Sequence, residues 1–260
     1  MAFKSILSPV IVENASPSRV AADFAAGLAA MNDARLLIMI AAPPVVLQGA
    51  FVLPAVRSMI ADANAQILRH AHAFRDGVRA IEGGATVDCE IVAERYLEAR
   101  ERIIAAARMS DLIVLTPVAE LMETRYDIMR AILFETGRPV LLVPARWEKA
   151  PAFRKIVVAW DGGASAARAL GDAMAFIEQA DQVEIVRVTP DSRTKSADVA
   201  ALGAHLSRHF RSVQVNELPL RDGDVGKTIR EHASLTRADL VVMGAFGHSR
   251  LWEKIGRAHV

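Results

Sequence analysis

Residues 238–251 read Ala238-Asp239-Leu240-Val241-Val242-Met243-Gly244-Ala245-Phe246-Gly247-His248-Ser249-Arg250-Leu251. Their apolar run has the length of a buried strand, and the two glycines that follow it favour a tight turn. An aspartate and a similar apolar run occur earlier, at Asp111-Leu112-Ile113-Val114-Leu115. Phe153-Arg154-Lys155-Ile156-Val157 likewise echoes Phe3-Lys4-Ser5-Ile6-Leu7. Two pairs of echoes in the same order indicate an internal repeat.

Each copy of this repeat alternates short apolar runs with longer amphipathic segments, which is typical of parallel strands joined by crossover helices. In the first copy we expect strands at 3–12, 35–42, 85–93, 111–116 and 139–143, and helices at 16–31, 55–81, 95–109 and 122–136. In the second copy we expect strands at 153–158, 182–189, 213–218 and 238–243, and helices at 164–180, 196–211 and 225–236. Ser16 and Pro17 suit the start of the first helix.

The repeat predicts two α/β domains, at residues 1–144 and 153–260, joined by a linker at 145–152 that contains two prolines. The interval from Phe3 to Asp111 exceeds that from Phe153 to Asp239 by 22 residues, (111 − 3) − (239 − 153). We expect the extra length between the second strand and the end of the second helix of the first copy. The second copy ends before a fifth strand, so we expect its sheet to lack the last strand and helix.

The bulk composition restricts the choice of partners. The 31 basic and 30 acidic residues give a net charge of +1, and aromatic residues are 5% of the chain, so we expect neither nucleic acid nor a membrane as partner. The single cysteine, Cys89, favours a reducing compartment, and the first residues lack a signal-peptide pattern. We therefore expect a cytoplasmic protein.

Two turns of the second copy carry the chemistry. In an open parallel sheet, ligands bind beyond the carboxyl ends of the strands, where the strand order reverses. Asp161 follows the first strand and precedes two glycines, so its carboxylate can accept hydrogen bonds from a ribose or a base; the alternative is that it only caps the next helix. Gly244 and Gly247 follow the fourth strand and allow backbone amides to approach a phosphate, with His248 and Ser249 as further donors.

These residues in combination resemble the universal stress protein family, both in the run 238–251 and in Val158-Ala159-Trp160-Asp161-Gly162. The segment 137–144 also resembles the last strand of that family, in the first copy. The resemblance implies two doubly wound parallel sheets with the strand order 3-2-1-4-5, and a site for ATP or AMP, with Mg²⁺ accompanying the nucleotide. It also implies that Asp161, Val188, Gly244, Gly247, His248 and Ser249 contact the nucleotide. The closing Gly-Ser/Thr of the family has no match here, since Gly256 stands one position early and precedes Arg257.

The first copy departs from the pattern in both turns. Its first strand, Ser8-Pro9-Val10-Ile11, has no aspartate after it, and residues 115–120 contain no glycine. We interpret the first copy as a structural partner that packs with the second as an intramolecular pseudo-dimer. The chain can also form a homo-oligomer.

Three functions stay open at this point, of which a stress-response module that binds adenine nucleotides is the first. A structural scaffold without nucleotide is the second, and a nucleotide-hydrolysing enzyme is the third. Phosphoryl transfer requires positioned cations and usually a metal site, and the sequence offers no paired carboxylates. His205 and His209 share one helical face but lack a third ligand nearby. We therefore expect no enzymatic activity, no catalytic residue and no metal site.

The last seven residues, 254–260, fit neither a helix nor a strand of the repeat. Ile255-Gly256-Arg257-Ala258-His259-Val260 is the translation of ATC GGA AGA GCA CAC GTC, a common sequencing-adapter sequence. We expect this segment to be an artefact, and the chain to be shorter than its natural parent.

Overall fold

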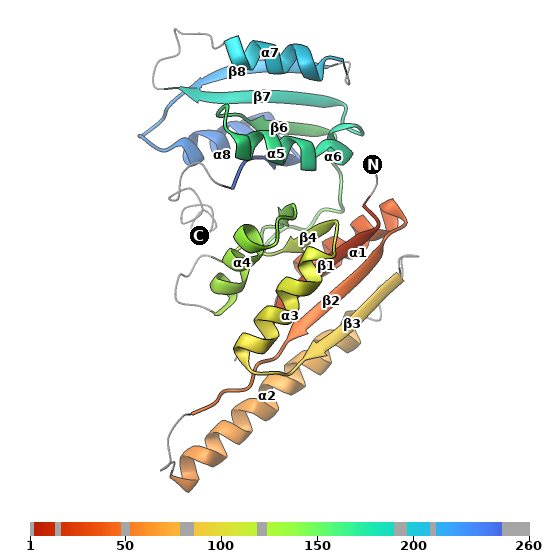
Figure 1. Cartoon of the computed structure of the whole chain (residues 1–260), viewed down its shortest axis with the longest axis vertical. Coiled ribbons are helices and arrows are strands. Elements are labelled where there is room, and N and C mark those ends of the chain that lie inside the picture. Colours follow the sequence, from red (N-terminus) through yellow and green to blue (C-terminus); the bar gives the residue numbers. More distant parts are fainter. Residues whose placement is uncertain are drawn as a thin grey trace. The chain divides into compact units, whose positions relative to one another are not determined.

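The computed structural model describes residues 3–13, 17–47, 53–78, 86–118, 124–189, 197–208 and 212–245 (Figure 1). The chain divides into two compact units between Pro151 and Ala152. Each unit contains one parallel sheet, and each is described below by itself.

The first unit has a five-stranded sheet in the order β3-β2-β1-β4-β5, with every neighbouring pair parallel. Its strands are β1 (Ser5–Ile11), β2 (Arg35–Ala41), β3 (Thr86–Val92), β4 (Leu112–Leu115) and β5 (Val140–Leu142). The helices that connect them are α1 (Val20–Asn32), α2 (Pro54–Val78), α3 (Tyr96–Arg108) and α4 (Thr124–Glu135). This topology confirms the strand order expected from the sequence.

The second unit has four parallel strands within its described residues, in the order β8-β7-β6-β9. These strands are β6 (Lys155–Ala159), β7 (Gln182–Thr189), β8 (Val213–Pro219) and β9 (Leu240–Val242). Its helices are α5 (Ala164–Asp172), α6 (Met174–Ile177), α7 (Ala197–Leu206) and α8 (Val225–Thr236). The order corresponds to 3-2-1-4 of the first sheet, as predicted. Residues 246–260, which include the segment 254–260 that we expect to be an artefact, lie outside the described part.

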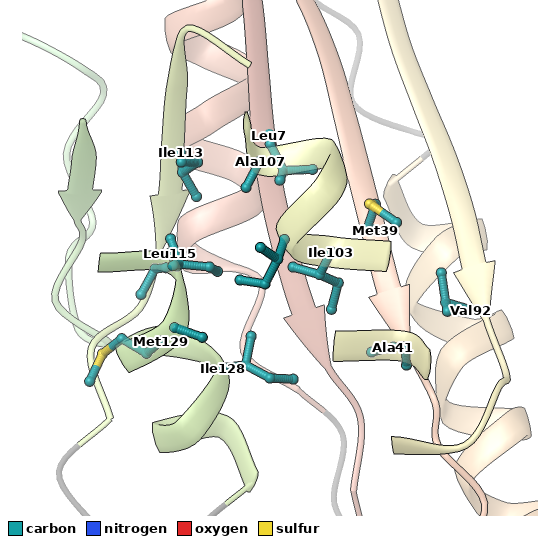
Figure 2. Packing of buried hydrophobic residues seen from close by; sticks show 14 residues of the cluster. Leu7, Met39, Ala41, Val92, Ile103, Ala107, Ile113, Leu115, Ile128 and Met129 are labelled. Atoms are coloured by element: carbon teal, nitrogen blue, oxygen red, sulfur yellow. The ribbon is translucent and has the colours of Figure 1, made fainter. Parts of the chain in front are cut away.

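Helices of the first unit cover its sheet on two faces. On one face, α3 and α4 pack on the strands through a cluster of fourteen buried residues, ten of which are labelled in Figure 2. The cluster combines Leu7, Met39 and Ile113 of the central strands with Ile103 and Ile128 of the helices. On the opposite face, α1 lies against β1, β2 and β4, and α2 lies against β2 and β3. A strand buried on both faces explains why residues 5–11 form an almost continuous apolar run.

The first helix begins later than predicted. Pro17 precedes the helix, which starts at Val20 with Arg19 as its N-cap. The hydroxyl of Ser18 accepts a hydrogen bond from the N–H of Val20 at 3.3 Å. The expected start at Pro17 is therefore wrong, and Ser16 lies outside the described residues.

The single helix expected at 164–180 is divided into α5 and α6. The N–H of Ala173 is shared between the carbonyl oxygens of Ala169, at 3.0 Å, and Leu170, at 3.1 Å. Such sharing tightens the last turn of a helix and ends its regular hydrogen bonding. The helix therefore stops at Asp172 and resumes at Met174.

The segment predicted as a linker packs on α1 of the first unit. The ring of Trp147 makes an edge-to-face contact with Phe24, with 6.5 Å between the ring centroids and 75° between the ring planes. Gly27 lies so close to Pro151 that an added Cβ would be 3.0 Å from its Cδ. Residues 145–151 thus belong to the first unit. The pseudo-dimer arrangement of the two domains stays a prediction.

One aspartate in each unit joins the beginnings of the first and fourth strands. The carboxylate of Asp111 accepts hydrogen bonds from the N–H groups of Lys4 and Ser5, both at 2.9 Å. Its own N–H donates to the carbonyl of Ser5 at 2.8 Å. In the second unit, Asp239 makes the same three bonds with Arg154 and Lys155. We call each arrangement the aspartate clamp; it holds β1 beside β4, and β6 beside β9, at their amino-terminal ends.

We expect Asp239→Ala to lower the free energy of unfolding of the second domain by about 2 kcal/mol, because two backbone donors lose a charged acceptor. Asp222→Asn is the control, since it removes the charge that pairs with the exposed Lys227, keeps a residue type that tolerates the left-handed backbone of position 222, and should change stability little. Urea unfolding followed by circular dichroism measures both variants. Equal stability of the two variants would show that the clamp contributes nothing beyond a surface ion pair.

Candidate functional site

The candidate site lies at the carboxyl ends of β6 and β9, where the strand order of the second sheet reverses. β6 pairs with β7 on one side and with β9 on the other. The chain leaves β6 toward α5 on one side of this point and leaves β9 into residues 243–245 on the other. Such a switch point separates two neighbouring turns and forms the ligand crevice of open parallel sheets.

The turn from β6 to α5 is organised by Asp161. Its Oδ1 accepts a hydrogen bond from the N–H of Gly163 at 2.8 Å, and Gly162 between them has φ 82°, in the left-handed region that favours glycine. Gly163 is the N-cap of α5. Asp161 therefore stands two positions before the cap and holds the N–H of the cap residue. The alternative that Asp161 only caps the next helix is therefore correct only in that its carboxylate binds the N–H of the cap residue.

The second carboxylate oxygen of Asp161 is free for another contact. Asp161 is exposed, and no residue in the described part of the chain donates a hydrogen bond to its Oδ2. A carboxylate can accept several hydrogen bonds at its two oxygens, so the bond to Gly163 leaves most of this capacity unused. The turn thus presents an anchored acceptor beyond the end of β6.

Gly244 brings the turn after β9 against the first turn of α5. A Cβ on Gly244 would lie 2.8 Å from the backbone nitrogen of Ala166, and also 2.8 Å from the carbonyl carbon and the Cβ of Ser165. These distances leave no room for any side chain, so only glycine allows this approach of the two backbones. Because the first N–H groups of a helix have no partner within the helix, the approach places residue 244 beside free donors.

The remaining predicted site residues are less informative. Val188 lies within β7, opposite Leu218 of β8, and its side chain packs on the core cluster of Val157, Ala159, Val186 and Ile229. It is therefore a strand residue rather than part of the turn after the strand. Gly247, His248 and Ser249 lie outside the described residues. Asp161 thus binds the N-cap residue of α5, and Gly244 lies against the first turn of the same helix.

Two further residues at this edge escaped the sequence reasoning. The indole Nε1 of Trp160 and the hydroxyl Oγ1 of Thr189 are buried, and neither has a hydrogen-bond partner in the structure of the described residues. Trp160 follows β6 directly, and Thr189 is the last residue of β7. In the sequence, only the position of these residues at the ends of predicted strands could have pointed to them. A sequence does not show which side chains become buried when the chain folds.

The first domain lacks the corresponding groups at the same edge. The aspartate clamps align the two domains: Lys155 matches Ser5, and Asp239 matches Asp111. Asp161, six positions after Lys155, then matches Ile11, and Gly244, five positions after Asp239, matches Thr116. The first domain thus has the apolar side chain of Ile11 in place of the carboxylate of Asp161. It also has the side chain of Thr116 at the position that matches Gly244, which has no side chain.

A metal site is not formed by the described residues, because no three of their histidine, cysteine, aspartate or glutamate side chains gather closely enough to hold an ion. Among the same residues, none of the helices combines the length and the apolar character needed to cross a membrane.

Comparisons with known proteins agree with this architecture. Residues 152–255 match the model of the Universal stress protein family. A search of curated proteins gives no match. The structure of a universal stress protein from Archaeoglobus fulgidus DSM 4304 covers 98% of this chain and 96% of its own, with 14% identity and a TM-score of 0.63.

A second solved structure, from Pseudomonas aeruginosa UCBPP-PA14 and described as a universal stress protein, covers 96% of this chain and 88% of its own. Its identity is 14% and its TM-score is 0.53. At such low identities the two structures establish the fold alone, and the match to the family model concerns residues 152–255. The second domain of this chain, residues 152–255, is therefore a domain of the Universal stress protein family.

Proposed function

We propose that the chain is a stress-response protein of the cytoplasm whose second domain binds an adenine nucleotide, ATP or AMP. The observation that carries the proposal is that Gly244 lies against the first turn of α5, the helix whose N-cap residue Gly163 donates its N–H to Asp161. Free N–H groups at a helix start favour the phosphates, and the carboxylate favours the hydroxyls of the ribose. When ATP is the ligand, Mg²⁺ would be bound through its phosphates.

The first domain, in this proposal, has a structural role. Ile11 has no side-chain acceptor to offer a ribose, and Thr116 carries a side chain at the position that matches Gly244. This division of roles suits a protein that senses a nucleotide. One domain would bind the nucleotide, and the other would pass the signal on. A scaffold without ligand is the alternative, and titration of the wild-type chain with ATP and AMP separates the two.

The proposal assigns binding and no catalysis. Hydrolysis of ATP requires a positioned nucleophile and cations that neutralise the developing charge. Asp161 offers one carboxylate before α5, and one of its oxygens accepts the N–H of Gly163. Analysis of products after long incubation with ATP tests the enzymatic alternative; release of ADP and phosphate by the purified chain would support it.

We expect Asp161→Ala to weaken the binding of AMP about 10- to 100-fold, because a hydrogen bond to a charged acceptor contributes roughly 1.5–3 kcal/mol. Asp161→Asn should lose less, since its amide oxygen can still accept the N–H of Gly163. Isothermal titration calorimetry measures the dissociation constants. Thr116→Ala, at the matching edge of the first domain, is the control and should bind as the wild type does. Equal losses from the changes at Asp161 and Thr116 would refute the assignment to the second domain.

We expect Gly244→Ala to reduce the free energy of unfolding by about 1–3 kcal/mol and to abolish measurable AMP binding, because the new Cβ must push the turn away from α5. The matched control is Gly171→Ala in the same helix, where an added Cβ meets no atom within 4 Å. That change should instead stabilise α5 by roughly 0.5–1 kcal/mol and leave binding unchanged. Unfolding and titration of both variants check the pair; tight AMP binding by Gly244→Ala would contradict the role of this contact.

A further inference from the structure

The segment that leads out of the first domain is fixed to that domain from its beginning. The N–H of Trp147 donates a hydrogen bond to the carbonyl of Pro144 at 2.9 Å, which closes a turn shortly after β5. The indole ring of Trp147 then lies edge-to-face on Phe24 of α1, and its Nε1 is buried. Residues 144–147 therefore turn from the end of the sheet directly onto a helix of the same domain.

Pro151 makes the next contact with the same helix. A Cβ on Gly27 would lie 3.0 Å from Cδ and 3.2 Å from Cγ of Pro151, so the pyrrolidine ring rests where a side chain of α1 would otherwise stand. Gly27 follows Phe24 by three positions, and residues three apart in a helix share one face. Trp147 and Pro151 thus contact one face of α1, and the exposed residues 148–150 are held at both ends.

The second domain binds the chain immediately afterwards. The ring of Phe153 packs on that of Phe176 in α6, with 4.5 Å between the ring centroids. The N–H of Arg154 donates to the carboxylate of Asp239 at 3.0 Å, as part of the aspartate clamp. The contacts of the second domain therefore begin at Phe153, and Ala152 is the single residue between the two anchored stretches.

Ala152 itself is not held in place. It is exposed, and within the described part of the chain neither its N–H nor its carbonyl makes a hydrogen bond. The ring of Pro151 fixes the φ angle of that residue. The rotatable backbone bonds between the domains are therefore ψ of Pro151, φ and ψ of Ala152, and φ of Phe153. Hinges in proteins are formed by a few residues of this kind, which absorb the change in φ and ψ.

We propose that Ala152 is the hinge between the two domains, and that residues 144–151 are a rigid extension of the first domain rather than a flexible linker. Relative motion is the usual behaviour of two domains in one chain, so the position of the hinge decides which motions are possible. A free segment 144–151 could extend to about 28 Å and let the domains separate. A hinge at Ala152 permits rotation with little separation. This holds whether or not the second domain binds a nucleotide.

The first experiment measures backbone order parameters of the full chain by ¹⁵N relaxation. Residues 145–150 should have values of about 0.85, as rigid backbone does, because both of their ends are anchored. Trp147→Ala should lower these values below about 0.6, since it removes the ring that packs on Phe24. The control is Lys149→Ala, which removes a cation 5.8 Å from the centre of that ring and should leave the values unchanged. Values below about 0.6 in the wild type, or unchanged values in Trp147→Ala, would overturn the inference.

A second experiment lengthens the chain at the hinge. Two glycines inserted after Ala152 add about 7 Å of reach between the domains. Spin labels are attached to Ala65→Cys in α2 and Ala204→Cys in α7, both at exposed positions, in a chain that carries Cys89→Ser. Double electron–electron resonance then measures the distribution of distances between the labels, which this insertion should broaden.

The matched control is the same two glycines inserted after Lys149. That insertion lies between the contacts of Trp147 and Pro151 with α1, so it should leave the distribution as in the wild type. Equal broadening by the two insertions would show that the whole segment is a flexible linker. A distribution unchanged by either insertion would show that Ala152 does not limit the movement of the domains. Each of these two results would overturn the inference.

Discussion

The aspartate clamp is the interaction on which the rest of each domain depends. In both domains one carboxylate accepts two backbone N–H groups from the residues that begin the first strand, at 2.9–3.0 Å. It thereby holds together two strands that are far apart in sequence: Asp111 is 107 residues from Lys4, and Asp239 is 85 from Arg154. Because the clamp acts at the amino-terminal edge, the opposite edge is left for turns that vary without loss of the sheet. The aspartate clamp and the candidate site thus lie at opposite ends of the same strands.

The difference between the two domains is concentrated at that opposite edge. Their sheets share the same strand order, but Ile11 and Thr116 stand where the second domain has Asp161 and Gly244. A missing carboxylate removes an acceptor, and an added side chain closes the space between two backbones. Changes of this kind alter binding and leave the buried strands untouched, which explains how one copy of a repeat can keep the fold while the other keeps the site.

Features determined by local chemistry were predictable from the sequence, and those determined by tertiary packing were not. The predicted bounds of β7 and α8 agree with the structure, since a β-branched run and an Asp224 cap define them locally. Asp161 and Gly244 were recognisable because aspartate and glycine have specific roles in turns. In contrast, Glu184 is 1% exposed and accepts hydrogen bonds from Asn216 and His232, 32 and 48 residues away. No pattern around Glu184 reveals such partners, and the burial of Thr189 was hidden for the same reason.

A crystal structure of the chain with AMP would test whether the site belongs to the second domain alone. We expect electron density for one nucleotide at the carboxyl ends of β6 and β9, with its ribose at Asp161 and its phosphate beside Gly244 and the start of α5. No nucleotide should be present at Ile11 and Thr116 of the first domain. A nucleotide bound at the edge of the first sheet, or bound away from Asp161 and Gly244 in the second, would show that the second domain does not hold the site in this way.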